Sequence, residues 1–77
     1  MAKIEDVREL IANQLGCDLE DVTADARIVE DLGAESSDVA NIVAAVEDKF
    51  GIKVPEENVQ NFTTVRDVLQ GIVDLSS

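Results

Sequence analysis

The sequence predicts an all-α fold: a small four-helix bundle with three main helices, one short helix and a long first loop. Apolar residues recur at spacings of three and four along three separate segments, which is the period of a helix with one buried face. The first two of these segments each end at a glycine, the residue that most readily adopts the left-handed conformation after a helix. No stretch alternates apolar and polar residues convincingly, as a half-buried strand would.

The first helix is expected from about Lys3 to Leu15, with Gly16 as its stop. Its apolar face consists of Ile4, Val7, Ile11 and Leu15. A long connection follows, from Cys17 to about Glu35, and a loop of this length in a compact domain is functional or held down by its own side chains. The aliphatic residues expected to hold it are Leu19, Val22, Ile28 and Leu32.

The second helix has the clearest pattern. Its apolar stripe consists of Val39, Ile42, Val43, Val46 and Phe50, and Gly51 supplies the stop. The segment "PEENVQNF" predicts a short helix with Pro55 in its first turn. Thr63 or Thr64 can cap a last helix, whose apolar face consists of Val65, Val68, Leu69 and Ile72.

Length and charge restrict the function. The 77 residues correspond to one domain, residues 1–77. Seventeen acidic residues against six basic ones give a net charge of −11, which argues against binding to nucleic acid or to an anionic membrane surface. The charge favours basic protein partners, steered in electrostatically, although acids that merely keep a small protein soluble would produce the same composition.

The residue types present argue against catalysis. The chain has no histidine, and therefore no Cys–His or Ser–His pair, and it has no glycine-rich phosphate loop, so we expect no enzyme. No acidic spacing matches a calcium loop, so we expect no metal site. Cys17 is the single cysteine, which excludes an internal disulfide, and no signal-peptide or membrane-spanning run is present. We expect a cytoplasmic monomer.

The stretch "DLGAESSD" contains adjacent serines, Ser36 and Ser37, where the second helix should begin. Capping is the commonest use of serine here, although neither has Glu or Gln three residues later. A helix start can also hold a phosphodiester, and helical periodicity weakly favours the outward-pointing Ser37 over Ser36, near the core boundary. The nearby acids would repel a bare phosphate, so the transfer would need an enzyme with its own metal and basic residues. These acids are Glu30, Asp31, Glu35 and Asp38.

The segment "VEDLGAESSDVANIVAAVEDKFGIKVPEE" resembles the centre of an acyl carrier protein, and "IANQLGCDLEDVTADARIVEDLG" and "TTVRDVLQGIV" extend the resemblance over nearly the whole chain. The resemblance implies that Ser36, which follows G-A-acid, accepts 4′-phosphopantetheine from coenzyme A through a phosphopantetheinyl transferase. This motif register overrides the preference for Ser37. The arm would carry acyl groups as thioesters between basic-surfaced enzymes of fatty acid, lipid or polyketide synthesis, and the bundle can shelter the acyl chain.

Some residues depart from the family pattern. Ser37 replaces the usual leucine, and Asn41 and Ala44 replace an acid and a larger apolar residue, which favours a specialised carrier over a housekeeping one. The residues expected to meet partners are Glu30, Asp31, Glu35, Ser37, Asp38, Asn41, Ala44, Glu47 and Asp48. Two alternatives are a free-standing aminoacyl or peptidyl carrier and, in a different class, an unmodified acidic interaction module.

Overall fold

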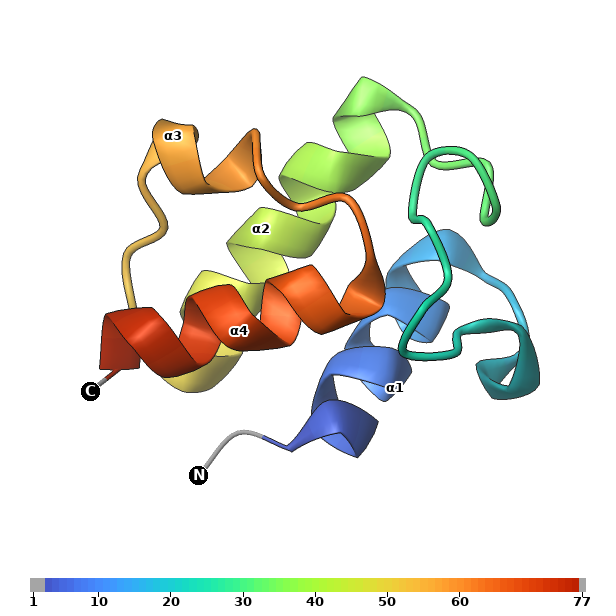
Figure 1. Cartoon of the computed structure of the whole chain (residues 1–77), viewed down its shortest axis with the longest axis horizontal. Coiled ribbons are helices and arrows are strands. Elements are labelled where there is room, and N and C mark those ends of the chain that lie inside the picture. Colours follow the sequence, from blue (N-terminus) through green and yellow to red (C-terminus); the bar gives the residue numbers. More distant parts are fainter. Residues whose placement is uncertain (1–2, 77) are drawn as a thin grey trace.

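Three long helices surround one apolar core in the computed structural model, which describes residues 3–76 (Figure 1). They are α1 (Ile4–Leu15), α2 (Ser36–Phe50) and α4 (Val65–Ser76). The short helix α3 (Glu56–Val59) lies between α2 and α4 in the chain, and one 3-10 turn, η1 (Leu19–Asp21), interrupts the first loop. α1 packs against both α2 and α4. The expected bundle of three main helices and one short helix is confirmed.

The core is aliphatic, as a chain with only two aromatic residues requires. Its most deeply buried side chains are Val7, Ile11, Val22, Ile28, Ile42, Val46, Val65, Val68 and Ile72. Seven of these nine lie on the apolar faces expected of the three long helices. Val22 and Ile28 come from the long first loop, so the loop is part of the packed interior.

Of the four aliphatic residues expected to hold the first loop, Val22 and Ile28 are buried, and the expectation is wrong for Leu19. Leu19 is 41% exposed, while Leu32 is partly buried against the core. The backbone carbonyl of Leu19, rather than its side chain, is held: it accepts a hydrogen bond from Arg8 Nη2 at 2.9 Å. Arg8 Nε also donates to the carbonyl of Val22 at 2.6 Å, so one half-buried arginine of α1 ties both ends of η1.

The ends of α1 and α2 agree with the sequence prediction, whereas both ends of α3 differ from it. Gly16 and Gly51 take the left-handed conformation after α1 and α2, as expected. α3 is shorter than "PEENVQNF" suggested: Pro55 directly precedes the helix, and after Val59 the chain leaves through tighter turns. In these turns Phe62 donates its N–H to the carbonyl of Val59 at 3.0 Å.

α4 begins with a reciprocal cap. Thr64 Oγ1 accepts the N–H of Asp67 at 3.2 Å, while the Asp67 carboxylate accepts the N–H groups of Thr64 and Thr63 at 3.0 and 3.2 Å. Thr64, not Thr63, is therefore the capping residue. Within residues 3–76 no helix is both long and apolar enough to cross a membrane.

Candidate functional site

Ser36 is the first residue of α2, and its side chain is exposed. The residue before it, Glu35, has an extended backbone and occupies the capping position. The Asp38 carboxylate accepts the N–H of Glu35 at 3.0 Å, as the glutamate of a capping box does. The prediction that Ser36 or Ser37 caps α2 is therefore wrong. Glu35 occupies the cap position, and the two serines are the first two residues of the helix itself.

Neither serine hydroxyl takes part in holding the fold together. Ser37 is exposed, as periodicity predicted, and Ser36 is also exposed, although periodicity placed it near the core boundary. Neither hydroxyl forms a hydrogen bond within the part of the chain that the structure describes. Exposure therefore does not distinguish the two serines.

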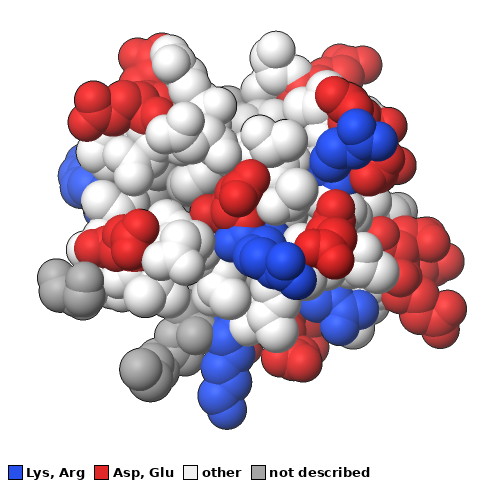
Figure 2. All heavy atoms as spheres, in the orientation of Figure 1, with Lys and Arg blue, Asp and Glu red and all other residues white. Residues whose placement is uncertain are grey.

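A hollow beside Ser36 does distinguish them. It has a volume of about 580 Å³, and Ser36 lines it whereas Ser37 does not. The lining residues are Val29, Ala34, Glu35, Ser36, Val39, Ala40 and Val59. A second hollow of about 340 Å³ shares Val29, Val39 and Val59 with the first, so the two adjoin between the first loop, α2 and α3, and together they are called the groove. Figure 2 shows an uncharged surface between α3 and the first turns of α2, with acidic side chains over α3 and at the other margins.

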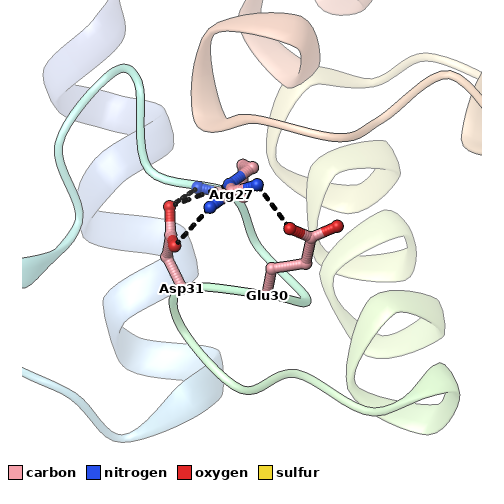
Figure 3. Close-up of polar contacts among 3 residues, drawn as sticks. All are labelled: Arg27, Glu30 and Asp31. Carbon is pink, nitrogen blue, oxygen red and sulfur yellow. Dashed lines mark hydrogen bonds and ion pairs between the residues drawn. The ribbon is translucent and has the colours of Figure 1, made fainter.

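The turn before Ser36 is held by ionic contacts (Figure 3). Asp31 Oδ2 accepts the backbone N–H of Arg27 at 2.9 Å, Asp31 Oδ1 lies 3.3 Å from Arg27 Nη2, and Glu30 pairs with the same guanidinium. The N–H of Arg27 and its side chain hold the pKa of Asp31 below its ordinary value. Hydrogen bonding to Asp31 raises the pKa of Arg27 in turn. Arg27 therefore offsets part of the negative charge expected to attract partners.

The backbone of the same turn connects Ser36 to the core. Gly33 has φ of 72°, which favours glycine, and its N–H donates to the carbonyl of Val29 at 3.1 Å. The next residue, Ala34, is 5% exposed and donates its N–H to the carbonyl of Ile28 at 3.1 Å. Because Ile28 is buried, the start of α2 is fixed to the interior through this turn.

The acids of α2 differ in what they can offer a partner. Glu47 is half-buried, and its carboxylate accepts the N–H of Val54 at 2.8 Å, so it holds the chain after α2. Asp38 closes the helix start. Asp48 is exposed, and its carboxylate forms no hydrogen bond or ion pair with any of residues 3–76. It shares an exposed stripe at helical spacing with Ser37, Asn41 and Ala44.

Several residues of the site were not predicted from the sequence. Arg27 and the groove residues Val29, Ala40 and Val59 belong to no apolar stripe that periodicity selected. Val29 did carry a signal: it is a large aliphatic residue directly after a core position, and it is 55% exposed at the groove.

Comparison with known proteins defines the class of this site. The family model described as "Phosphopantetheine attachment site" matches residues 5–72. The chain is 43% identical over 74 residues to the acyl carrier proteins of Helicobacter pylori strain G27 and Helicobacter acinonychis strain Sheeba, covering 96% of this chain and 95% of each relative. The fold and the match thus define a carrier domain for a phosphopantetheine arm. Within that class, the chain belongs to the acyl carrier protein family.

Solved structures agree with this assignment. A Mycobacterium tuberculosis protein assigned as an acyl carrier protein superposes with a TM-score of 0.85 at 29% identity, covering 94% of this chain and 97% of that one. The apo doublet acyl carrier protein from prodigiosin biosynthesis shares the fold, with a TM-score of 0.82 at 24% identity. This chain spans 35% of the length of that doublet.

Proposed function

We propose that Ser36 is the residue that bears 4′-phosphopantetheine, and that the chain carries acyl groups between enzymes without catalysing a reaction itself. One observation supports Ser36 over its neighbour: of the two free hydroxyls, only that of Ser36 borders the groove. An arm attached there begins beside an apolar surface large enough to receive part of its cargo.

The attachment needs a hydroxyl that the fold does not use. The Ser36 oxygen forms a bond to the pantetheine phosphate of coenzyme A, the phosphate's bond to adenosine 3′,5′-bisphosphate breaks, and the hydroxyl proton passes to a base of the transferase. The N-terminus of the 15-residue α2 offsets the negative charge of the resulting phosphodiester. The arm, once attached, supplies a thiol that holds an acyl group as a thioester.

The groove is suited to sheltering an acyl chain. Its first part, about 580 Å³, falls in the range of small-molecule sites, and valine and alanine provide five of its seven lining residues. Glu35 and Ser36 are the two polar residues of this lining. An acyl chain folded back from Ser36 would therefore exchange water for aliphatic contacts.

The surface around Ser36 supports basic partners. Glu35 and Asp48 are exposed acids at the two ends of α2, whereas Glu30 and Asp31 are partly neutralised by Arg27. The three exposed stripe positions between them, Ser37, Asn41 and Ala44, are uncharged. We infer that partners of this carrier rely less on charge along α2 than partners of a generic carrier do, which favours service in a specialised pathway.

Intact mass spectrometry tests the proposed function. The chain is incubated with coenzyme A, magnesium and a broad-specificity phosphopantetheinyl transferase, and a parallel sample omits coenzyme A. The expected result is a gain of one phosphopantetheinyl group in the complete mixture alone. A mass that stays unchanged with an active transferase would contradict the proposal and favour an unmodified interaction module.

A further inference from the structure

Gly71 lies inside α4, where glycine is the least favourable residue after proline. Its backbone does not explain the choice, because Gly71 is not among the glycines with positive φ. Its surroundings do. A Cβ at this position would lie 3.0 Å from Phe62 Cζ and 2.7 Å from Phe62 Cε1, and the shorter of these distances is essentially never seen for a real Cβ. The ring of Phe62 is therefore seated where a side chain of residue 71 would be.

The seated ring separates two hollows with different linings. On one side lies the second part of the groove, where Phe62 and three valines form one half of the lining and polar residues form the other half. The valines are Val29, Val39 and Val59, and the polar residues are Arg27, Glu30, Gln60 and Thr63. On the other side lies a hollow of about 180 Å³ over α4, in which every lining residue except Phe62 and Gly71 is polar. Its polar residues are Asn58, Asn61, Asp67, Gln70 and Asp74. Phe62 is the residue common to both hollows.

We propose that Phe62, seated on Gly71, is the end wall of the groove and sets the length of acyl chain that the protein shelters. This inference rests on the proposed attachment at Ser36, at the opposite end of the groove. Carbons placed between Ser36 and the ring can contact valine and alanine on both parts of the groove, although polar side chains also line the second part. Carbons beyond the ring would meet only amides and carboxylates around Gly71. Sheltering therefore gains stability with each added methylene only as far as Phe62.

Gly71 sets the position of this wall. Because residue 71 has no side chain, the ring can lie against α4 and leave the groove open. A methyl group at residue 71 must displace the ring away from α4. Four residues of α4 line the hollow on one side of the ring, whereas none lines the groove, so we expect movement away from α4 to bring the ring into the groove. Gly71→Ala should therefore shorten the groove, while Phe62→Ala should join it to the hollow over α4.

The test uses the full-length chain as wild type, Gly71→Ala, Phe62→Ala, Phe62→Leu and Val73→Ala. Val73 is exposed on the same helix and lines none of these hollows, so its variant is the matched control. Each protein is loaded by the transferase with phosphopantetheine or with acyl-phosphopantetheines of increasing even chain length. The measured quantity is the Tm of the acyl form minus the Tm of the holo form of the same variant, which removes the effect of the substitution on the fold.

For the wild type and Val73→Ala we expect this difference to rise, by at most roughly 3–6 °C per sheltered methylene, and then to level off at one chain length. In Gly71→Ala the Tm difference should level off at a shorter chain than in the wild type, and in Phe62→Ala at a longer one. Phe62→Leu should level off at a chain length between those of Phe62→Ala and the wild type. The same plateau in Gly71→Ala, Phe62→Leu and the wild type would overturn the inference, even if Phe62→Ala fails to fold. Intact mass separates the two proposals: failure to load counts against the proposed function, whereas normal loading with an unchanged plateau counts against the end wall alone.

Discussion

The first loop holds the start of α2, where Ser36 lies. Substitution of Ile28 tests most directly how much of the protein's stability depends on the packing of this loop. Ile28 is 2% exposed in the core, donates its N–H to the carbonyl of Thr63 at 2.9 Å and accepts the N–H of Ala34 at 3.1 Å. Ile28→Ala keeps both backbone hydrogen bonds and removes three buried carbons. Their transfer free energy is about 2.4 kcal/mol at about 0.8 kcal/mol each. The cavity left behind adds to this, so we expect a loss of about 3 kcal/mol in the free energy of unfolding.

For a domain of this size such a loss lowers Tm by roughly 12–24 °C. Urea titration should show a lower midpoint with an unchanged slope, because the surface exposed on unfolding hardly changes. The matched control is Val29→Ala at the next position, which is 55% exposed and should change the stability by no more than about 0.5 kcal/mol. Ile28→Val, expected to lose about 1 kcal/mol, keeps the test measurable if the alanine variant is largely unfolded. A loss below about 1 kcal/mol for Ile28→Ala would refute the conclusion that the loop belongs to the core.

Three further outcomes follow from the charge and composition of the surface. The net charge of −11 predicts self-repulsion, so Tm should rise as salt shortens the Debye length from about 30 Å to about 10 Å, and rise further in millimolar magnesium; a flat Tm would contradict this. The lowered pKa of Asp31 predicts that its contribution to stability is complete above the ordinary value of 3.8 and declines as the pH falls below it. The stability difference between wild type and Asp31→Asn, measured in urea, should therefore shrink in acid, and an equal difference at neutral and acidic pH would exclude this role. Restoring family-like residues on the exposed stripe, as Ser37→Leu, Asn41→Glu and Ala44→Met together, should raise steady-state turnover of the holo protein by a generic ketoacyl synthase; equal rates at low and physiological salt would count against specialisation through this face.

The helices could be predicted from the sequence because their signals are local. Ile42 and Val46, four residues apart, both proved to be buried, and Gly51 ends the helix as its backbone freedom suggested. The short helix was predicted too long because "PEENVQNF" has few apolar positions from which to judge a period. Its observed end at Val59 depends on the turns that return the chain to α4.

The arrangement of the loop could not be predicted in the same way. Arg8 lies between apolar positions of α1, where a charged residue is usually solvated, and only the folded loop brings carbonyl acceptors within its reach. The contact between the Phe62 ring and Gly71 depends equally on the fold, because the turn between α3 and α4 brings the ring back onto the helix. The capping role of Asp38 was not predicted because the serines were expected to be the caps, whereas Asp38 lies three residues after the actual cap position, Glu35.

The proposal that Ser36 is the attachment site came from the motif register and not from helical geometry, which weakly favoured Ser37. The structure adds a physical distinction, because Ser36 alone of the two lines the groove. Since both hydroxyls are exposed at the start of α2, neither substitution should disturb the core, and each can be tested in a folded protein.

Peptide mapping of the modified protein tests the central claim most directly. Wild type, Ser36→Ala and Ser37→Ala are each incubated with coenzyme A, magnesium and the transferase, and the modified peptide is sequenced by tandem mass spectrometry. We expect the arm on Ser36 in the wild type, no modification of Ser36→Ala, and nearly full modification of Ser37→Ala. An arm on Ser37, or a modified Ser36→Ala, would contradict the assignment.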